Sequence, residues 1–170
     1  MILAISKILK KDGYSLLDTV EFIQKAVDTY LKRYPVLLRK AFALYHFSPY
    51  HINRLRTAAT RSQLRRYPGD WVFTFVQGDG KGFNFGVDIH ECAIMKFYRA
   101  QRVEELTPYL CQLDHLLGER MNLGFDRQGT LANGATVCDC RWKYGAQTRR
   151  WSPIGDLVRQ DQSIKWRSTL

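Results

Sequence analysis

Residues 71–92 have the sequence WVFTFVQGDGKGFNFGVDIHEC, and they give the clearest structural pattern in the chain. Residues 71–76 are aromatic or β-branched, which is the composition of a β-strand. A glycine-rich turn occupies residues 78–82, and residues 83–89 alternate apolar with polar or small side chains. A strand, a glycine-rich turn and an alternating strand predict a β-hairpin. The turn sequence GDGKG lacks the spacing and the strand–glycine–helix order of a phosphate-binding loop, so we interpret it as a plain hairpin turn.

Helical patterns precede this hairpin. Apolar residues recur every three to four positions over residues 15–45, which predicts a long helical region with Ser15 or Asp18 as its N-cap. Pro35 should break or kink this region near Tyr34, so the pattern fits two helices as well as one. A short basic helix is expected over residues 51–66, before the turn-forming sequence Tyr-Pro-Gly-Asp.

Two further helices and a second hairpin follow. The apolar spacing predicts helices over residues 91–103 and 108–122, then strands over residues 125–131 and 136–142 joined by an Ala-Asn-Gly turn. Hairpins and helices in this order are typical of an α+β protein. We therefore predict an antiparallel sheet of about four strands, built from two hairpins and covered by helices, with an N-terminal helical region.

A chain of 170 residues fits one domain. We expect that domain to span residues 1–142, with a helical part over 1–67 and a hairpin–helix–helix–hairpin part over 68–142. Residues 143–170 would form a basic C-terminal extension. Its two tryptophans could belong to an arm that reaches across a homodimer or to a tail packed on its own domain, and the sequence leaves both open.

The composition excludes several classes of protein. With 45% hydrophobic and 13% aromatic residues the chain is too apolar for intrinsic disorder. No apolar run approaches the ~18–20 residues of a spanning helix, so we expect no membrane partner. Residues 1–13 predict a helical turn or two and no secretory signal, which favours the cytoplasm. In that compartment the four cysteines are expected to be thiols.

The net charge of +10 favours an acidic partner, whether nucleic acid, an anionic membrane surface or a small carboxylate substrate. Residues 54–66 hold five arginines and no acid, and Tyr50 and Tyr67 flank them. Nucleic-acid binding through this helix is one interpretation. It is the less favoured one, because no known nucleic-acid fold accompanies the cluster and its aromatic residues are not interleaved with the arginines. A small carboxylate substrate is the third kind of acidic partner that the charge allows.

The densest group of reactive side chains lies where the first hairpin passes into a helix. His90, Glu91 and Cys92 follow one another there. A thiol at a helix N-terminus has a lowered pKa and is a better nucleophile, so Cys92 is a candidate. The alternative is structural: Glu91 caps the helix, Cys92 fills the core and His90 lies on the surface.

Two further cysteine clusters stand near carboxylates. Cys111 and Asp114 are three residues apart, hence on one face of the predicted helix. Cys138 and Cys140 are two apart on the last strand and so point to the same face of the sheet. Buried thiols of this kind are usually core residues.

A zinc site would need cysteines from several of these clusters. The set Cys92, His90, Cys111 and Cys138 has no standard zinc spacing. We therefore expect no metal and no cofactor.

Three of these motifs together resemble the L-2-amino-thiazoline-4-carboxylic acid hydrolase family. They are Glu-Cys at 91–92, Leu-Cys-x-Leu-Asp at 110–114, and Thr-Leu-Ala-x-Gly…Cys-Asp-Cys-Arg at 130–141. The resemblance covers residues 70–142. It implies hydrolytic opening of a cyclic amidine-like thioether to N-carbamoyl-cysteine, on a route to L-cysteine.

Such a reaction needs a base for water, a proton donor for the leaving sulfur or ring nitrogen, and an arginine fork for the substrate carboxylate. The candidates are Asp114 or Glu91 as base, Cys92 or Cys111 as nucleophile, His90 as acid, and Arg99, Arg127, Arg141 and Cys138 for substrate binding. We expect Glu91, Asp114 and Cys138 to converge around one enclosed hollow.

The last motif is also similar, more distantly, to vinyl-reductase-type and haem-NO-binding-type sensor domains. In those domains a Cys-x-Phe strand closes a small-ligand pocket, and here Cys140 stands where the aromatic residue would be. This similarity keeps a second interpretation open, in which the chain binds a small ligand without turning it over.

Overall fold

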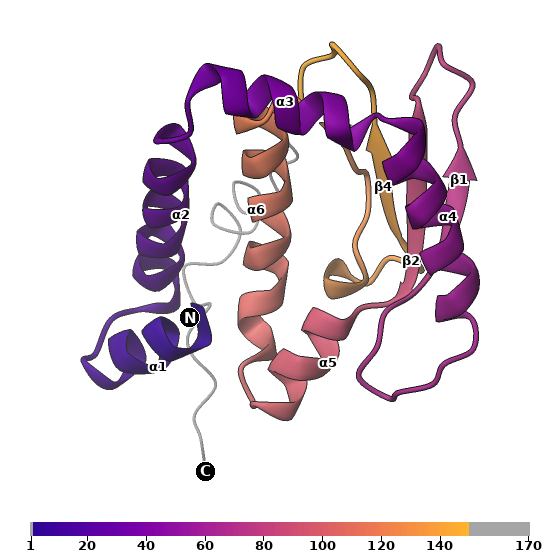
Figure 1. Ribbon diagram of the computed structural model, residues 1–170. Helices are drawn as coiled ribbons and strands as arrows, with labels where there is room; N and C mark the ends of the chain where they lie inside the picture. The colour runs from indigo at the N-terminus through magenta and orange to yellow at the C-terminus, as the bar shows by residue number, and fades with distance from the viewer. Residues whose placement is uncertain (1, 150–170) are drawn as a thin grey trace.

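The computed structural model describes residues 2–149, and they form the predicted α+β fold: six helices and a four-stranded antiparallel sheet (Figure 1). The helices are α1 (Ile2–Lys11), α2 (Leu16–Lys32), α3 (Val36–His46), α4 (Pro49–Ser62), α5 (Ala93–Ala100) and α6 (Thr107–Arg120). The strands are β1 (Val72–Gln77), β2 (Phe85–Glu91), β3 (Phe125–Asp126) and β4 (Cys138–Trp142), and two 3-10 turns, η1 (Glu104–Leu106) and η2 (Leu131–Asn133), lie between them.

The N-terminal helices follow the sequence pattern closely. The predicted break at Pro35 is confirmed, since α2 ends at Lys32 and α3 begins at Val36. Ser15 is the N-cap of α2 and forms a capping box with Asp18. The first helix is longer than the turn or two expected, with ten residues.

The basic helix α4 is displaced from its expected range of 51–66 toward the N-terminus. The Ser48 hydroxyl accepts the His51 N–H at 3.2 Å, so the helix starts at Pro49. It ends at Ser62, whose hydroxyl accepts the backbone N–H of Phe73 at 3.1 Å and so ties the helix end to β1. This bond crosses eleven residues, and local spacing does not signal it.

The first hairpin is confirmed by the sheet, which has the order β1-β2-β4-β3. Phe75 of β1 lies opposite Val87 of β2, and a register shift follows Val72. Gly78 is required in the connecting turn, because a Cβ there would lie 2.2 Å from the carbonyl oxygen of Phe83.

The second hairpin forms with a much shorter first strand than expected. The predicted strand over 125–131 is wrong beyond Asp126, where β3 ends. The Asp139 carboxylate accepts the N–H groups of Gln128 and Gly129, at 3.1 and 2.7 Å, and bends the chain out of the ladder into η2. The bend occurs immediately after Arg127.

The two faces of the sheet differ in character. Val87, Cys138 and Cys140 form one core cluster on the face that α4 and α6 cover, and Leu55 of α4 packs against it. Residues of the other parity, such as Asp88 and Arg141, pair on the opposite face. The helix-covered face is therefore where a buried site can form.

The segment after β4 continues along the domain as far as Arg149, whose N–H donates to the Phe125 carbonyl at 3.1 Å. The two tryptophans of the predicted extension, Trp151 and Trp166, lie outside the described residues. Within residues 2–149 no helix has the length and apolar character needed to cross a membrane. The four cysteines are free thiols, as expected.

Candidate functional site

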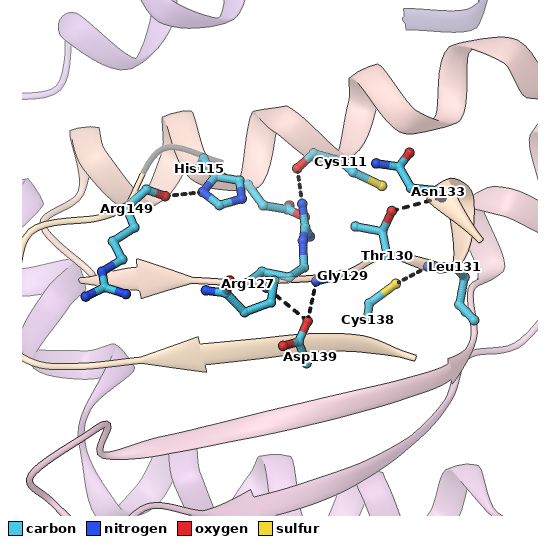
Figure 2. Close-up of polar contacts among 12 residues, drawn as sticks. Cys111, His115, Arg127, Gly129, Thr130, Leu131, Asn133, Cys138, Asp139 and Arg149 are labelled. Atoms are coloured by element: carbon cyan, nitrogen blue, oxygen red, sulfur yellow. Dashed lines mark hydrogen bonds and ion pairs between the residues drawn. The ribbon is translucent and has the colours of Figure 1, made fainter. Parts of the chain in front are cut away.

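The candidate site is built around a buried arginine. Arg127 follows β3, and only 2% of its surface is exposed. Nη1 donates to Asp114 Oδ2 at 2.6 Å, and Nη2 donates to the backbone carbonyl of Cys111 (Figure 2). Nε has no hydrogen-bond partner among the described residues. A buried charge costs free energy unless it is paired and fully hydrogen-bonded, so this guanidinium is held at some expense of stability.

The local fold explains why Arg127 points inward. The bend held by Asp139 takes the chain out of the sheet, and Figure 2 shows Arg127 extending from there toward Cys111 on α6. The guanidinium carbon lies 5.3 Å from the ring centre of Phe125. The prediction that Cys111 and Asp114 share a helix face is confirmed, because Arg127 contacts both.

Four thiols lie near enough to this guanidinium for its charge to act on them. Cys138 and Cys140 are each 4% exposed on the same face of β4, as alternation predicted. The Cys138 sulfur accepts the Leu131 N–H at 3.2 Å. The positive charge of Arg127 acts to lower the pKa of all four, which are Cys92, Cys111, Cys138 and Cys140.

Burial nevertheless raises the pKa of every one of these thiols. It raises the pKa of Cys111 and of Cys140 to about 12. The expectation of a lowered pKa at Cys92 is wrong: its sulfur caps α5 and accepts the Met95 N–H at 3.4 Å, but burial has the larger effect and raises the pKa. The thiols are thus neutral at pH 7, and a free thiolate nucleophile is disfavoured.

His115 belongs to this site, although sequence reasoning did not select it. It is 3% exposed, and its ring lies 4.9 Å from that of Phe125. Nδ1 lies 2.6 Å from the Arg149 carbonyl, so Nδ1 carries the proton and Nε2 is an acceptor without a partner among the described residues. Burial lowers the His115 pKa, which keeps the ring neutral.

Four other predicted residues do not join this centre. Glu91 is paired with Lys96 at 2.6 Å and with Arg65. His90 is exposed, and its ring lies 3.1 Å from the Thr74 hydroxyl. Arg141 lies 2.7 Å from Asp88 on the opposite face of the sheet. Arg99 is exposed on α5.

The structure thus divides the predicted set. Cys92, Cys111, Asp114, Arg127 and Cys138 gather between α5, α6 and the sheet. The expected convergence of Asp114 with Cys138 is found, and Glu91 is engaged elsewhere. That the space among them is hollow stays a prediction.

The described residues do not assemble the zinc set that the sequence suggested. His90 lies on the open face of the sheet, away from the thiols. Across residues 2–149 no group of three or more His, Cys, Asp or Glu side chains is placed to hold a metal ion.

A comparison with models of protein families matches residues 3–142 to the family described as L-2-amino-thiazoline-4-carboxylic acid hydrolase. The match extends the resemblance seen in residues 70–142 to the N-terminal helices. Searches of curated proteins and of solved structures found no match.

Proposed function

The chain belongs to the L-2-amino-thiazoline-4-carboxylic acid hydrolase family, and we propose that it hydrolyses a small cyclic amidine that carries a ring sulfur and a carboxylate. Water adds to the carbon between nitrogen and sulfur, with its hydroxyl on that carbon and its proton on the ring nitrogen. The carbon–sulfur bond then breaks, and the hydroxyl proton passes to the sulfur. For the aminothiazoline carboxylate the product is N-carbamoyl-cysteine, a step toward cysteine.

The observation that carries this proposal is Arg127, buried and with Nε free of any partner in residues 2–149. A guanidinium binds a carboxylate best through two parallel N–H groups. Nη1 is engaged by Asp114 and one N–H of Nη2 by the Cys111 carbonyl, so Nε and the second N–H of Nη2 form the edge that would receive the substrate carboxylate. The low exposure of Arg127 strengthens that bond relative to one in water.

Asp114 is the proposed base. Oδ2 accepts from Arg127, and 54% of the Asp114 side chain is exposed, so water can reach this carboxylate while it stays anchored. It takes the proton of the attacking water and delivers it to the ring nitrogen, and later moves the hydroxyl proton to the departing sulfur. A positioned carboxylate contributes about 10²–10⁴-fold in such transfers.

The thiols have a different role in this proposal from the nucleophile first considered. Cys111, Cys138 and Cys140 are neutral at pH 7, because burial raises the pKa of each. Neutral thiols behave as small apolar side chains and give a lining of low polarity against which the substrate sulfur can pack.

The test is turnover of the aminothiazoline carboxylate by the full chain, followed by free-thiol release and by the mass of the product. Asp114→Asn should lower kcat by about a hundredfold or more. The matched control is Asp28→Asn, because Asp28 forms the same kind of ion pair with Arg120, also at 2.6 Å, between α2 and α6. It should leave turnover unchanged.

Two outcomes contradict the proposal. In the first, a folded Asp114→Asn variant keeps its activity, which removes the carboxylate from the mechanism. In the second, the wild-type chain releases no thiol yet binds the compound in a calorimetric titration. That result assigns the chain to the alternative class of small-ligand binding domains.

A further inference from the structure

The helix α3 carries its apolar residues on the outside. Six of its large apolar side chains are exposed, with Leu37 at 76% and Leu44 at 61%. Ala43 is the buried residue of this helix. A surface helix normally directs its apolar stripe to the core and its polar residues to solvent, so α3 has the opposite orientation over much of its surface.

Helical geometry places two of these residues on one stripe with Ala41. At about 100° per residue, Leu37, Ala41 and Leu44 fall within about 60° of one another and at least about 100° from Ala43. All three are exposed. From Leu37 to Leu44 the stripe extends over about 10 Å, two turns of this eleven-residue helix. Contiguous apolar surface of this kind marks an interaction site.

The charge along the sequence segment that holds α3 and α4 has a single sign. From residue 29 to residue 69 the chain has no Asp or Glu, and it has nine basic residues. They are Lys32, Arg33, Arg39, Lys40, Arg54, Arg56, Arg61, Arg65 and Arg66. Residues 29–69 include both α3 and α4, so the apolar stripe lies in a wholly cationic part of the chain.

The stripe continues into a groove on α4. The Tyr45 ring of α3 lies 6.5 Å from that of Tyr50, which lines this groove. The groove has a volume of about 1040 Å³. Its charged and aromatic lining residues are Tyr50, Arg54, Arg61, Arg66, Asp70 and Trp71. Three arginines and one acid make it a receptor for anionic groups, and Trp71 is brought to them from the start of the first hairpin.

We propose that α3 and the groove of α4 dock on the surface of an anionic lipid bilayer. Exposed leucines would enter the boundary between headgroups and acyl chains, and the arginines would contact lipid phosphates. Our expectation of no membrane partner rests on the lack of an apolar run long enough to span a bilayer, but a helix lying in the plane of the surface needs no such length. The proposal is independent of the hydrolytic function.

Charge and chemistry favour this partner over two others. A second copy of the chain would bring the same cationic surface against itself, which is repulsive. Single-stranded nucleic acid would use the arginines, Tyr50 and Trp71, yet it would leave the aliphatic Leu37 and Leu44 without a contact. Of these three partners, only a bilayer offers acyl chains to the leucines and phosphates to the arginines.

The experiment is co-sedimentation of the full chain with vesicles of phosphatidylcholine alone or mixed with phosphatidylglycerol. Binding should require the anionic lipid, and it should fall as ionic strength rises from about 0.01 M to about 1 M and the Debye length shortens from about 30 to about 3 Å. The double variant Leu37→Gln/Leu44→Gln should bind the mixed vesicles about tenfold more weakly. Arg54→Gln/Arg61→Gln should lower the affinity and flatten the salt dependence.

The matched control removes two exposed apolar residues elsewhere. Ile94 and Leu117 are 41% and 37% exposed on α5 and α6, and Ile94→Gln/Leu117→Gln should bind like the wild type, with circular dichroism showing all variants folded. Equal binding to neutral vesicles would overturn the electrostatic part. Absence of vesicle binding would overturn the whole. Light scattering that shows a dimer lost in the leucine variant would then assign the stripe to a second copy, and oligonucleotide binding indifferent to that variant would assign the groove to nucleic acid.

Discussion

The centre around Arg127 and the outer face of α3 depart from ordinary protein architecture in opposite directions. Arg127 is a charged side chain that is 2% exposed, whereas Leu37 is an aliphatic one that is 76% exposed. Neither arrangement favours folding, since a buried charge is desolvated and an exposed leucine forgoes its burial. Each unfavourable arrangement therefore indicates a different ligand. The interior centre suits a small anion, and the α3 face suits a large anionic surface.

The largest effect we expect follows from removing the interior charge. Arg127→Met keeps the volume but deletes the carboxylate receptor, so kcat/KM should fall by about a hundredfold, as for other lost charge-assisted bonds. Stability should change little, because an apolar residue often replaces a buried charge without loss. Arg120→Met, which breaks the ion pair with Asp28, is the control. Wild-type kcat/KM in Arg127→Met would show that the centre is only structural.

A second prediction concerns the stability of the fold at acidic pH, which depends on His46 on the inner side of α3. Burial, and secondly the charge of His51, lowers the pKa of His46 to about 4. The unfolded chain, with a His pKa near 6.5, then binds more protons than the folded chain between about pH 6.5 and pH 4. The free energy of unfolding should therefore decrease as pH falls through this window, by at most about 3 kcal/mol from His46.

Urea unfolding at several pH values measures this loss. His46→Phe should flatten the profile, because it removes the buried group that must gain a proton. Burial also lowers the pKa of His51 and of His115, so part of the slope should persist. The exposed His90 serves as the control, and a His90→Phe variant with the larger change would refute the assignment to His46.

The fold was predictable where its determinants are local. The alternation over residues 83–89 and the break at Pro35 specify a strand and a helix boundary without reference to the rest of the chain. The length of β3 was not predictable in this way, because Asp139 ends the strand by accepting hydrogen bonds from N–H groups ten and eleven residues earlier. Likewise, the spacing of apolar residues in α3 does not show that its stripe is exposed, because exposure depends on which elements pack against the helix.

The site was predictable only in part, for the same reason. The spacing of Cys111 and Asp114 defines a shared helix face in any context. Arg127 could not be separated from Arg99 by sequence, because burial distinguishes them. Alternation along β4, by contrast, places Arg141 on the face opposite Cys138 and Cys140. The pKa of Cys92 was predicted in the wrong direction, since a helix N-terminus is a local feature and desolvation depends on the whole fold.

A third prediction tests how strongly the interior pair holds the fold. Asp114→Asn leaves the buried Arg127 facing a neutral amide, and unfolding should require about 1–2 kcal/mol less, a figure below that of a fully buried pair because Asp114 is half exposed. Asp28→Asn should cost about half as much, because Arg120 is 25% exposed and can be rehydrated. Equal losses in urea unfolding would mean that the burial of Arg127 adds nothing to the pair.

We expect the smallest effect at the outer face of α3, where it distinguishes an exposed stripe from a packed one. If the stripe is solvent-exposed in the free chain, Leu37→Gln/Leu44→Gln should change the free energy of unfolding by no more than about 0.5 kcal/mol per site. Leu16→Ala, at a residue with no exposed surface, should cost about 3 kcal/mol in the same experiment. A loss in the double variant as large as that of Leu16→Ala would mean that the leucines are already packed in solution, and the stripe would then be part of an interface rather than a surface open to a bilayer.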